Sequence, residues 1–307
     1  MPGMHRSGMK TREKYRRSVQ TVSLILTNLY VQGWIYGTIF TGRSKMFCIP
    51  GLHCYSCPSS VLSCPVGSLQ NILSSNGFLA GFASGRADSL IILGLLGFLL
   101  FFGFLAGRFA CGWICPFGFL QDMLYRIPSP KFRIPASWRD GKYAFLLLFV
   151  ILFPLLLRTV PVAGGDPWFC KAVCPAGTLG AGIPLALHDG GRTLQLGFLF
   201  SWKTAVMVLV LLWVVTSKRA FCRVVCPLGA IWGVSGKLSL FRMRVDRSCV
   251  KCGICREVCP VDIAIYEEPN SAECIRCGRC MDVCPVDAIH HDTKRNQAEK
   301  RSGNDNP

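Results

Sequence analysis

The sequence predicts an α-helical integral membrane protein that is built from four transmembrane helices and carries a small α+β domain at its C-terminus. Hydrophobic residues make up 51% of the 307 residues and charged residues only 17%, which is low against roughly 25% in soluble domains. Four apolar stretches approach the length of about 20 residues that crosses a bilayer. The residues after the fourth stretch are more polar and repeat a regular cysteine spacing, which indicates a separate domain.

The four predicted spans are residues 19–40, 90–105, 143–162 and 198–215. The second is the most lipophilic, and the first is weakly polar through Thr21, Asn28 and Gln32. The pair Arg16-Arg17 before the first span could be read as a twin-arginine signal, but no small-residue cleavage site follows cleanly, so we favour an uncleaved anchor. No histidine lies in any span, which excludes a haem held by two histidines within the membrane.

Lysine and arginine are unevenly distributed among the segments outside the spans. Three segments are rich in them: the N-terminal one (Arg6, Lys10, Arg12, Lys14, Arg16, Arg17), the second connection (Arg108, Arg126, Lys131, Arg133, Arg139, Lys142) and the one after the fourth span (Lys218, Arg219, Arg223). Basic residues favour the cytoplasmic side. We therefore expect a multi-pass protein of the inner (cytoplasmic) membrane, with both termini and the C-terminal domain in the cytoplasm. The lipid bilayer is its expected partner.

The remaining charge pattern supports the same interpretation. The net charge of +17 lies beside the apolar runs, and no reader motif accompanies it, so no nucleic-acid partner is expected. Arg158 and Lys203 lie in apolar context near the outer ends of the third and fourth spans. Each side chain could reach the interface from there, or it could serve a redox site on the outer side.

The C-terminal domain contains a cysteine motif that occurs twice. Cys249-x-x-Cys252-x-x-Cys255-x-x-x-Cys259-Pro260 recurs with identical spacing as Cys274-x-x-Cys277-x-x-Cys280-x-x-x-Cys284-Pro285, which identifies an internal repeat. This spacing is typical of bacterial ferredoxins, in which three cysteines hold one cluster and the fourth ligates the other. We therefore expect a two-cluster bacterial ferredoxin domain of the α+β class with two [4Fe–4S] clusters.

Two ligand sets follow from this crossover. The first is Cys249, Cys252, Cys255 and Cys284, and the second is Cys274, Cys277, Cys280 and Cys259. Zinc is the alternative metal, but zinc sites use isolated cysteine pairs that close a tetrahedron. Gly253 and Gly278 permit the close backbone approach that a cluster needs. No nucleophile or acid–base pair accompanies the cysteines, so we predict an electron carrier with no catalytic residue and leave its standing as an enzyme open.

The other ten cysteines are also ordered. The second and fourth spans are followed by Cys111-x-x-x-Cys115-Pro116 and Cys222-x-x-x-Cys226-Pro227, and the outer connections contain Cys170-x-x-x-Cys174-Pro175 and Cys48, Cys54, Cys57 and Cys64-Pro65. The separation of Cys64 from Cys174 along the chain is almost the same as that of Cys115 from Cys226. This indicates a tandem two-span repeat, which can build sites where its halves meet. The inner set would be Cys111, Cys115, Cys222 and Cys226, and the outer set Cys57, Cys64, Cys170 and Cys174.

Several roles remain open for these sets. The inner cysteines could ligate a further Fe–S cluster, form a redox dithiol, or be structural, because Cys-Pro also suits the start of a helix. The outer cysteines could bind metal or form disulfides and redox thiols in an oxidising compartment. Cys48 and Cys54 could pair, and His53 could be a loop residue, a ligand or a base for quinol. A bound quinone could bridge the roughly 30 Å of hydrocarbon.

The chain divides into four predicted parts. Residues 1–18 form a basic cytoplasmic N-terminus, 19–240 the four-span membrane domain with its Cys-x-x-x-Cys-Pro motifs, 241–291 the ferredoxin domain and 292–307 a polar tail that is expected to be disordered.

The motifs FACGWICPFGFLQDMLYRIP and FCRVVCPLGAIWG, together with the eight-cysteine tail, resemble the NapH-type membrane polyferredoxins, whose core is also found in NosR- and MauN-type proteins. The resemblance implies four spans, two [4Fe–4S] clusters and electron transfer between the quinol pool and respiratory redox partners, ferredoxin-type or cytochrome, as in a quinol dehydrogenase component. It makes the eight tail cysteines the cluster ligands, and it matches Cys111, Cys115, Cys222 and Cys226 to the family's second motif.

The outer segments GLHCYSCPSSVLSCPVGSLQ and WFCKAVCPAG contain more cysteine than a minimal NapH-type protein. The leading hypothesis is a membrane-bound iron–sulfur protein that passes electrons between quinol, or an outer redox partner, and the ferredoxin clusters. The alternative is a transmembrane thiol–disulfide relay or redox maturation factor for a partner protein, which the outer cysteines motivate. A purely structural anchor would leave the ten ordered cysteines of the core without a purpose.

Overall fold

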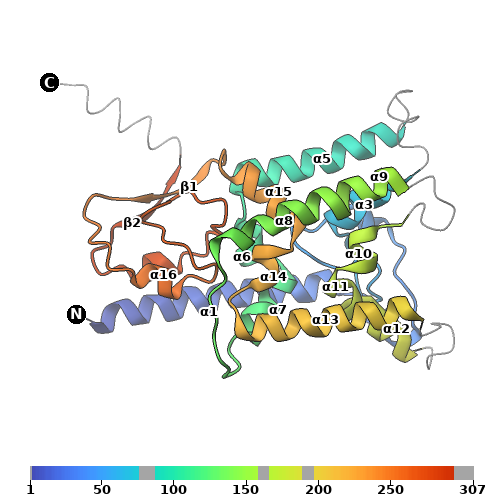
Figure 1. Ribbon diagram of the computed structural model, residues 1–307, viewed down its shortest axis with the longest axis horizontal. Helices are drawn as coiled ribbons and strands as arrows, with labels where there is room; N and C mark the ends of the chain where they lie inside the picture. Colours follow the sequence, from blue (N-terminus) through green and yellow to red (C-terminus); the bar gives the residue numbers. More distant parts are fainter. Residues whose placement is uncertain (1, 76–86, 158–165, 189–196, 294–307) are drawn as a thin grey trace.

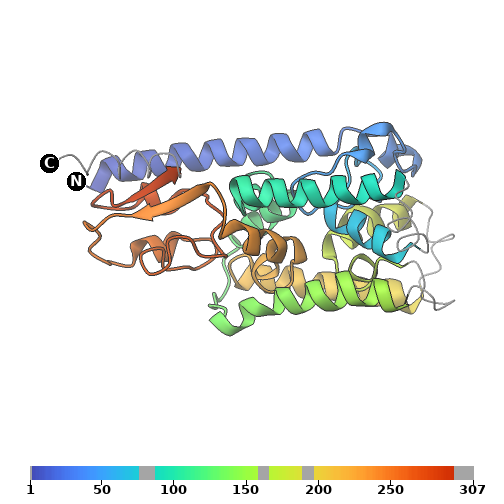
Figure 2. The same cartoon turned by 90° about the horizontal axis from the view of Figure 1, so that it is seen from above.

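The computed structural model describes residues 2–75, 87–157, 166–188 and 197–293. It consists of an elongated bundle of helices with a small domain of loops, short helices and two strands at one end (Figure 1). The long helix α1 (Pro2–Thr27) begins beside the small domain and continues along the bundle, so it lies against both parts (Figure 2).

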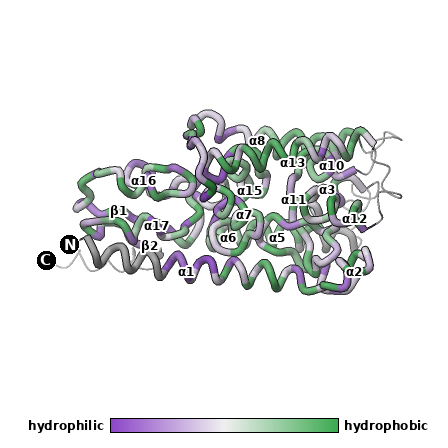
Figure 3. The backbone as a smooth tube through the Cα atoms, turned by 90° about the horizontal axis from the view of Figure 1, so that it is seen from below, coloured by the Kyte–Doolittle hydropathy of each residue, from purple (hydrophilic) through white to green (hydrophobic). Residues whose placement is uncertain are grey.

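Two helices coincide with predicted spans. They are α5 (Ala87–Ala106) and α13 (Phe198–Thr216). Among the residues that the structure describes, α13 is the one helix long and apolar enough to cross a membrane. Within α5, the apolar helical stretch Ile92–Ala106 is shorter. Apolar residues dominate both helices, whereas polar residues dominate the part of α1 beside the small domain (Figure 3).

The first predicted span, residues 19–40, is not one helix. Helix α1 ends at Thr27, and a separate short helix, α2 (Gln32–Tyr36), follows. The side chains of Thr27 and Asn28 donate hydrogen bonds to backbone carbonyls of the last turns of α1, which is how such residues compete with a continuing helix. The prediction of a continuous span was therefore wrong at this point, and the polar residues noted in the sequence mark the break.

The third predicted span is helical where the structure describes it. It is formed by α8 (Gly141–Phe145), the π-helical η3 (Leu146–Leu152) and α9 (Phe153–Leu156). Pro154 lies just after the π-helical segment, and its missing N–H explains why regular α-helical bonding is interrupted before it. The end of this span and Arg158 lie outside the described residues.

Four helices begin with a Cys-Pro pair: α3 (Pro65–Ser74), α7 (Pro116–Leu124), α11 (Pro175–Gly177) and α15 (Pro227–Gly236). In each case the cysteine is the N-cap with extended backbone and proline occupies the first turn, the position that tolerates its missing N–H. Helix α11 continues through the π-helical η5 (Thr178–Gly182) into α12 (Ile183–His188). The Cys-Pro motifs therefore do start helices.

Three of these helices share a preceding turn. Short helices α6 (Phe109–Trp113), α10 (Trp168–Ala172) and α14 (Ala220–Val224) each contain the first cysteine of a Cys-x-x-x-Cys pair. The backbone N–H of the second cysteine then bonds the carbonyl five residues earlier, at 3.0 Å for Cys115, 2.9 Å for Cys174 and 3.0 Å for Cys226. The same turn at three places is the structural counterpart of the sequence repeat. Two 3₁₀ segments, η1 (Arg43–Met46) and η2 (Ala136–Asp140), complete the bundle.

The small domain has an internal repeat of its own. Strands β1 (Phe241–Val245) and β2 (Ile289–Thr293) pair antiparallel, with Phe241 opposite Thr293 and Val245 opposite Ile289. Between them lie helices α16 (Ile254–Val258) and α17 (Arg279–Asp282). Gly253 and Gly278 precede these helices with φ of 79° and 77°, a left-handed conformation that glycine adopts without steric cost. The two cysteine loops therefore have the same backbone geometry.

One hydrophobic core runs from the bundle into the small domain. It includes Leu52, Phe117 and Trp232 in the bundle and continues through Ile263 and Ile275 of the cysteine loops. A second, smaller core lies under the two strands and includes Met243, Cys255, Ile265, Cys284, Ala288 and Ile289. The cysteine loop nearest the bundle is thus packed into the same apolar interior as the helices.

Candidate functional site

The second predicted ferredoxin set, Cys259, Cys274, Cys277 and Cys280, comes together in the structure. All four cysteines line one small cavity of about 20 Å³, with Cys255 of the first set beside them. Burial, together with the nearby thiolates of Cys277 and Cys259, raises the pKa of the Cys274 thiol to about 12. Burial and the charges of Cys277, Cys274 and Cys259 likewise raise the pKa of Cys280. Such mutual effects act only at short range.

The first predicted set, Cys249, Cys252, Cys255 and Cys284, lies around the loop before α16. Burial raises the pKa of Cys255, and the thiolates of Cys252 and Cys249 act in the same direction. Cys284 packs in the small core with Cys255, and its sulfur accepts a hydrogen bond of 3.3 Å from the backbone N–H of Ala288. The fourth cysteine of each motif thus lies by the other loop, which is the placement that the crossover requires.

The donor chemistry of these sets is that of an iron–sulfur cluster. No group of three or more His, Cys, Asp or Glu residues within the described ranges lies close enough to hold one metal ion. Four cysteine thiolates are the donor set of a [4Fe–4S] cluster, which is a larger body than one ion and is gripped from further apart. These eight cysteines remain the predicted ligands.

The inner cysteines Cys111, Cys115, Cys222 and Cys226 form a second kind of set, here called the inner tetrad. Each is at most 6% exposed. Burial raises the pKa of Cys226 well above its ordinary value, and the thiolates of Cys222, Cys111 and Cys115 raise it further. The two halves of the sequence repeat contribute two cysteines each, and the structure brings all four together.

Two arginines brace the inner tetrad across the halves. The guanidinium of Arg108 donates to the carbonyl of Cys222 at 3.0 Å, and that of Arg219 donates to the carbonyl of Cys111 at 2.8 Å. Each arginine stands three residues before the first cysteine of its own half, and each is 1% exposed. Sequence reasoning counted both only as orientation charges. Their identical spacing from the cysteines was the signal that could have revealed this role.

A glutamine donates to a thiol at both ends of the bundle. Gln121 Nε2 lies 2.9 Å from the sulfur of Cys222, and Gln70 Nε2 lies 3.4 Å from the sulfur of Cys170. Each glutamine stands six residues after a Cys-Pro cysteine of the first half, in CPVGSLQ and CPFGFLQ. In each case it reaches the first cysteine of a motif in the second half.

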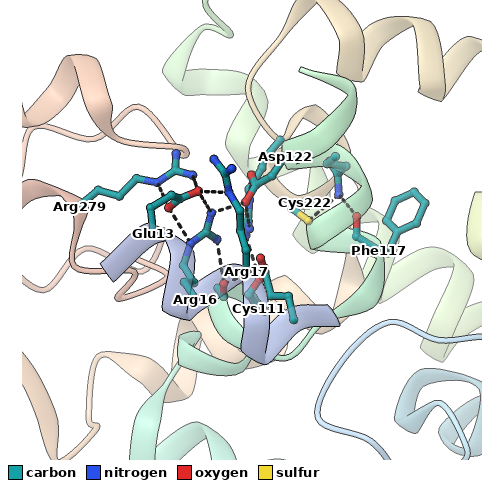
Figure 4. Close-up of polar contacts among 12 residues, drawn as sticks. Glu13, Arg16, Arg17, Cys111, Phe117, Asp122, Cys222 and Arg279 are labelled. Carbon is teal, nitrogen blue, oxygen red and sulfur yellow. Dashed lines mark hydrogen bonds and ion pairs between the residues drawn. The ribbon is translucent and has the colours of Figure 1, made fainter. Parts of the chain in front are cut away.

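A buried ion-pair network joins α1, the bundle and the small domain (Figure 4). Asp122 accepts from Arg16 at 2.9 Å and from Arg219 at 2.8 Å. Glu13 accepts from Arg16 at 3.0 Å and from Arg279 at 2.8 Å. Although burial raises the pKa of Glu13, the hydrogen bonds from Arg16 and Arg279 outweigh it and lower the pKa to about 2. Sequence reasoning missed this network because the pairs that join α1 to the bundle and to the small domain connect residues far apart along the chain.

The second ferredoxin set lies against the inner tetrad. The indole N–H of Trp113 donates to the carbonyl of Arg276 at 3.2 Å. A Cβ on Gly112 would come within 2.6 Å of the carbonyl oxygen of Ile275, so only glycine permits this approach. Gly112 directly follows Cys111 and Ile275 directly follows Cys274. The two sites are therefore joined through adjoining residues.

A second buried ion cluster supports the same contact. Glu273, which precedes Cys274, accepts from Arg108 at 2.8 Å and from the buried ammonium of Lys142. Arg108 is the same residue that braces the inner tetrad. This arginine therefore connects the ferredoxin loop to the bundle site by charge as well as by packing.

The outer cysteines group differently from the prediction. Cys54, Cys64, Cys170 and Cys174 line one cavity, and Cys57 does not. Cys57 instead lies within hydrogen-bonding distance of Asn28 and Ser59. The expected outer set is therefore corrected by one member, Cys54 for Cys57. A pairing of Cys48 with Cys54 is not found, because every cysteine of the chain is a free thiol in the structure.

The sequence left the roles of Lys203 and His53 open, and the structure places both residues at the outer cavity. Lys203 lines the same cavity as the outer cysteines, which favours a role beside that site. His53 is buried there, and its Nε2 has no hydrogen-bond partner within the described residues. Burial and the charge of Lys45 lower the pKa of His53 to about 4.

Comparison with known proteins agrees with these cysteine sites. A family described as a 4Fe-4S binding domain matches residues 89–135, 144–184 and 198–247, and a second 4Fe-4S binding domain family matches residues 268–290. The first family therefore covers the three Cys-x-x-x-Cys-Pro pairs of the bundle, each in its own segment. No solved structure matches the chain.

Several curated proteins are similar to the chain. An uncharacterized protein of Methanocaldococcus jannaschii is 32% identical over 204 residues, 66% of this chain and 70% of that protein. The methylamine utilization ferredoxin-type protein MauN of Methylorubrum extorquens is 31% identical over 55% of this chain and 53% of its own length. The ferredoxin-type protein NapH of Haemophilus influenzae is 28% identical over 56% and 54%. The chain thus spans about half the length of these two named relatives.

Proposed function

The chain belongs to the NapH-like, ferredoxin-type iron–sulfur proteins, and from this premise we propose that it carries single electrons across a membrane, between quinol or an outer redox partner and its two ferredoxin clusters. The coarser part, an iron–sulfur electron-transfer role, follows from the relatives and the family matches. The observation that carries the finer part is the serial order of the cysteine sets along the molecule.

The order begins inside the ferredoxin domain. Cys255 of the first set lines the cavity of the second set. Its thiolate also raises the pKa of Cys280, although burial and the thiolates of the second set contribute more. The contact of Gly112 with Ile275 then connects the second set to the inner tetrad. When bound, clusters supply one-electron oxidation and reduction at cysteine-ligated iron. The protein's part is to hold successive sets in contact and to keep water out of the core between them.

The membrane placement rests on exposed apolar helix faces. Leu93 and Phe101 on α5 and Leu209 and Leu212 on α13 are all more than half exposed. Contiguous apolar surface of this kind is rare on soluble proteins, and helices are the elements that can expose such faces to lipid. In this arrangement the first crossing is made by the end of α1 and the segment with α2 that follows its break, the third crossing includes α8, η3 and α9, and the ferredoxin end faces the cytoplasm.

An apolar cavity of about 720 Å³ between α1, α7 and η5 is suited to quinol. Its walls include Ile25, Leu120 and Leu179, and it extends from His53 to Pro116, the residue after Cys115. This volume is within the range of about 300–1,000 Å³ found for small-molecule sites. A quinol head group at the Pro116 end of this cavity would lie beside the inner tetrad. A cluster held by that tetrad could accept the two electrons of the quinol one at a time, and the two protons would be released to water.

The thiol–disulfide relay is less well supported. A relay requires outer thiols that a partner protein can reach. Cys64 and Cys174 are only 4% and 6% exposed, so at least these two are withheld from such exchange.

The proposal is tested on the full chain, purified anaerobically in detergent. We expect at least about eight irons per chain for the two ferredoxin clusters, and bleaching of their visible absorbance when a short-chain quinol is added. Replacing Ile25, which lines the cavity, by Trp should slow this bleaching at least tenfold. Val22→Trp on the same helix is the matched control, because Val22 is exposed and lies outside the cavity lining.

An iron-free protein would contradict the electron-transfer role itself. Full iron content with no reduction by quinol would leave the carrier role standing and would assign the electron source to an outer redox partner. Equal slowing in Ile25→Trp and Val22→Trp would contradict the quinol site.

A further inference from the structure

A cavity of about 420 Å³ lies in the bundle at the end away from the ferredoxin domain. Four cysteines line it, and they come from four separate elements. Cys54 is in the loop before α3, Cys64 is the N-cap of α3, Cys170 is in α10, and Cys174 is the N-cap of α11. Cys48 and Cys57, although close in sequence, are not among the lining residues. The fold therefore selects four of six outer cysteines.

We propose that Cys54, Cys64, Cys170 and Cys174, here called the outer tetrad, ligate an additional iron–sulfur cluster that exchanges electrons with the inner tetrad. The inference deepens the proposed function and rests on it, since it supplies the outer end of the electron path. Four thiolates are a complete ligand set for such a cluster.

The members of the outer tetrad are brought together by the packing of the elements that carry them. A Cβ on Gly67 of α3, the helix that Cys64 caps, would lie 3.8 Å from the sulfur of Cys170. A Cβ on Gly177 of α11, the helix that Cys174 caps, would lie 3.9 Å from the sulfur of Cys54. The four cysteines therefore surround one space, whose walls they share.

The donor set narrows the metal chemistry. An all-cysteine set suits zinc or an iron–sulfur cluster. The cavity of about 420 Å³ between the four thiols has room for a body larger than a single ion. The lining residue Lys203 and nearby Lys45 carry positive charge that would partly balance four thiolates. These features favour a cluster.

The outer tetrad also repeats the supporting structure of the inner one. Gln70 donates to Cys170 as Gln121 donates to Cys222. The carbonyl side of Gln70 accepts from the backbone N–H of Phe169 at 2.7 Å, which holds the amide in the orientation that points its N–H at the sulfur. Because both halves of the repeat place a glutamine donor on a cysteine, we expect the outer tetrad to serve the same kind of site as the inner tetrad.

The backbone of two successive residues, Leu52 and His53, connects the two tetrads. The backbone N–H of Leu52 donates to the sulfur of Cys115 at 3.3 Å. The backbone of the next residue, His53, hydrogen-bonds the thiol of Cys64. Cys115 belongs to the inner tetrad and Cys64 to the outer one. An electron that leaves the outer cluster therefore has a path of covalent and hydrogen bonds to the inner site.

The electron balance of this step is simple. One electron would leave the reduced outer cluster and would reduce an iron–sulfur cluster held by the four thiolates of the inner tetrad, and no bond to the protein would form or break. A one-electron protein donor on the outer face then reduces the outer cluster again. The reverse direction has the same balance with donor and acceptor exchanged.

The test counts metal in single-cysteine variants of the full chain. Iron, zinc and acid-labile sulfide are measured per chain in anaerobically purified protein, and the reduced clusters are followed by EPR. Cys54→Ser and Cys174→Ser should each lose about four irons and four sulfides, the content of one [4Fe–4S] cluster. Cys57→Ser and Cys48→Ser are the matched controls and should retain the wild-type content. The ferredoxin signals should persist in all four.

Several outcomes overturn the proposal. Wild-type iron in Cys54→Ser, equal iron loss in Cys57→Ser, or loss of zinc instead of iron each contradicts an iron–sulfur site at the outer tetrad. If the serine variants do not accumulate, the proposal is tested on the wild-type protein by alkylation of its cysteines. Unfolding with an alkylating agent should label all four tetrad cysteines, and recovery of any of them in a disulfide contradicts the proposal. Loss of the ferredoxin signals from wild-type protein would instead contradict the proposed function.

Discussion

The ferredoxin domain and the helical bundle assemble their cysteine sets over very different distances along the chain. Both ferredoxin sets come from the segment 249–284, in which consecutive cysteines of a loop are three residues apart. The inner tetrad joins Cys111 to Cys222, which belong to opposite halves of the bundle. In the first region the spacing itself shapes the site, since Gly253 and Gly278 turn each loop. In the second region the site exists only if two halves of the bundle pack correctly.

This difference explains why the bundle has reciprocal braces. Arg108 and Arg219 cross between the halves and each bonds the other half's first inner cysteine at its carbonyl. The ferredoxin loops obtain their geometry from local turns. We therefore expect the bundle sites to be far more sensitive than the ferredoxin sites to loss of long-range polar contacts, and the following changes test this expectation in order of decreasing effect.

The largest effect is expected from Arg219→Gln. This change leaves Asp122 with one fewer cation and removes the bond to the carbonyl of Cys111. Breaking a buried ion pair costs about 3–5 kcal/mol of folding free energy. The midpoint of thermal unfolding in detergent should fall, and iron bound by the bundle should be lost while the ferredoxin EPR signals remain.

Arg17→Gln is the control for that change. Arg17 is 40% exposed and pairs with Glu13 within one helix, so the expected loss is below about 1 kcal/mol. Parallel loss of ferredoxin and bundle iron in Arg219→Gln would show that the two regions depend on the brace equally.

A smaller effect is expected from Gly112→Ala, which acts at the contact between the regions. The new Cβ would lie 2.6 Å from the carbonyl oxygen of Ile275, and overpacking of this kind costs about 1–3 kcal/mol. Both regions should keep their iron, but stopped-flow reduction of the ferredoxin clusters from the membrane side should become slower, because the loop must move away from the inner tetrad.

Gly97→Ala is the matched control for this contact. A Cβ at Gly97 meets no atom within 4 Å, and alanine is favoured over glycine in a helix. This variant should keep the wild-type rate and should be no less stable. An unchanged rate in Gly112→Ala would mean that electrons do not cross at this point.

The smallest effect is expected from the two glutamines. Gln121→Leu removes one hydrogen bond to Cys222, and Gln70→Leu removes one to Cys170; each bond contributes about 1 kcal/mol. Hydrogen bonds to sulfur stabilise the more negative, reduced state of a cluster. Redox titration should therefore show a lower potential at the inner site for the first variant and at the outer site for the second. Equal shifts of the ferredoxin potentials would contradict these assignments.

Repeated spacing along the chain made two groupings predictable, that of the ferredoxin cysteines and that of the inner tetrad. One constant offset relates the two ferredoxin motifs, and another relates Cys111 and Cys115 to Cys222 and Cys226. The outer set failed at one member because Cys54 and Cys57 both lie before Cys64 and have no counterpart in the second half. Spacing could not choose between Cys54 and Cys57, whereas the lining of the outer cavity includes Cys54 and not Cys57.

The buried charges were the larger omission. Five basic side chains are at most 1% exposed: Arg16, Arg108, Lys142, Arg219 and Arg223. From the sequence we interpreted them as charges that orient the protein in the membrane. Both statements can hold, since they lie at the ferredoxin end of the bundle. Apart from the pair of Arg16 with Glu13, three residues apart in α1, their carboxylate partners are distant along the chain, so no local pattern could reveal those ion pairs.

The amino-acid sequence by itself determined which residues can ligate clusters, where helices begin at Cys-Pro pairs, and that the bundle is duplicated, because these depend on short-range spacing and on the backbone limits of proline and glycine. Only the tertiary structure decided which cysteines share a cavity, where the first span breaks, and that Leu52 and His53 connect the tetrads. Those outcomes depend on how distant segments pack, and packing is set by the sum of many weak contacts over the whole chain.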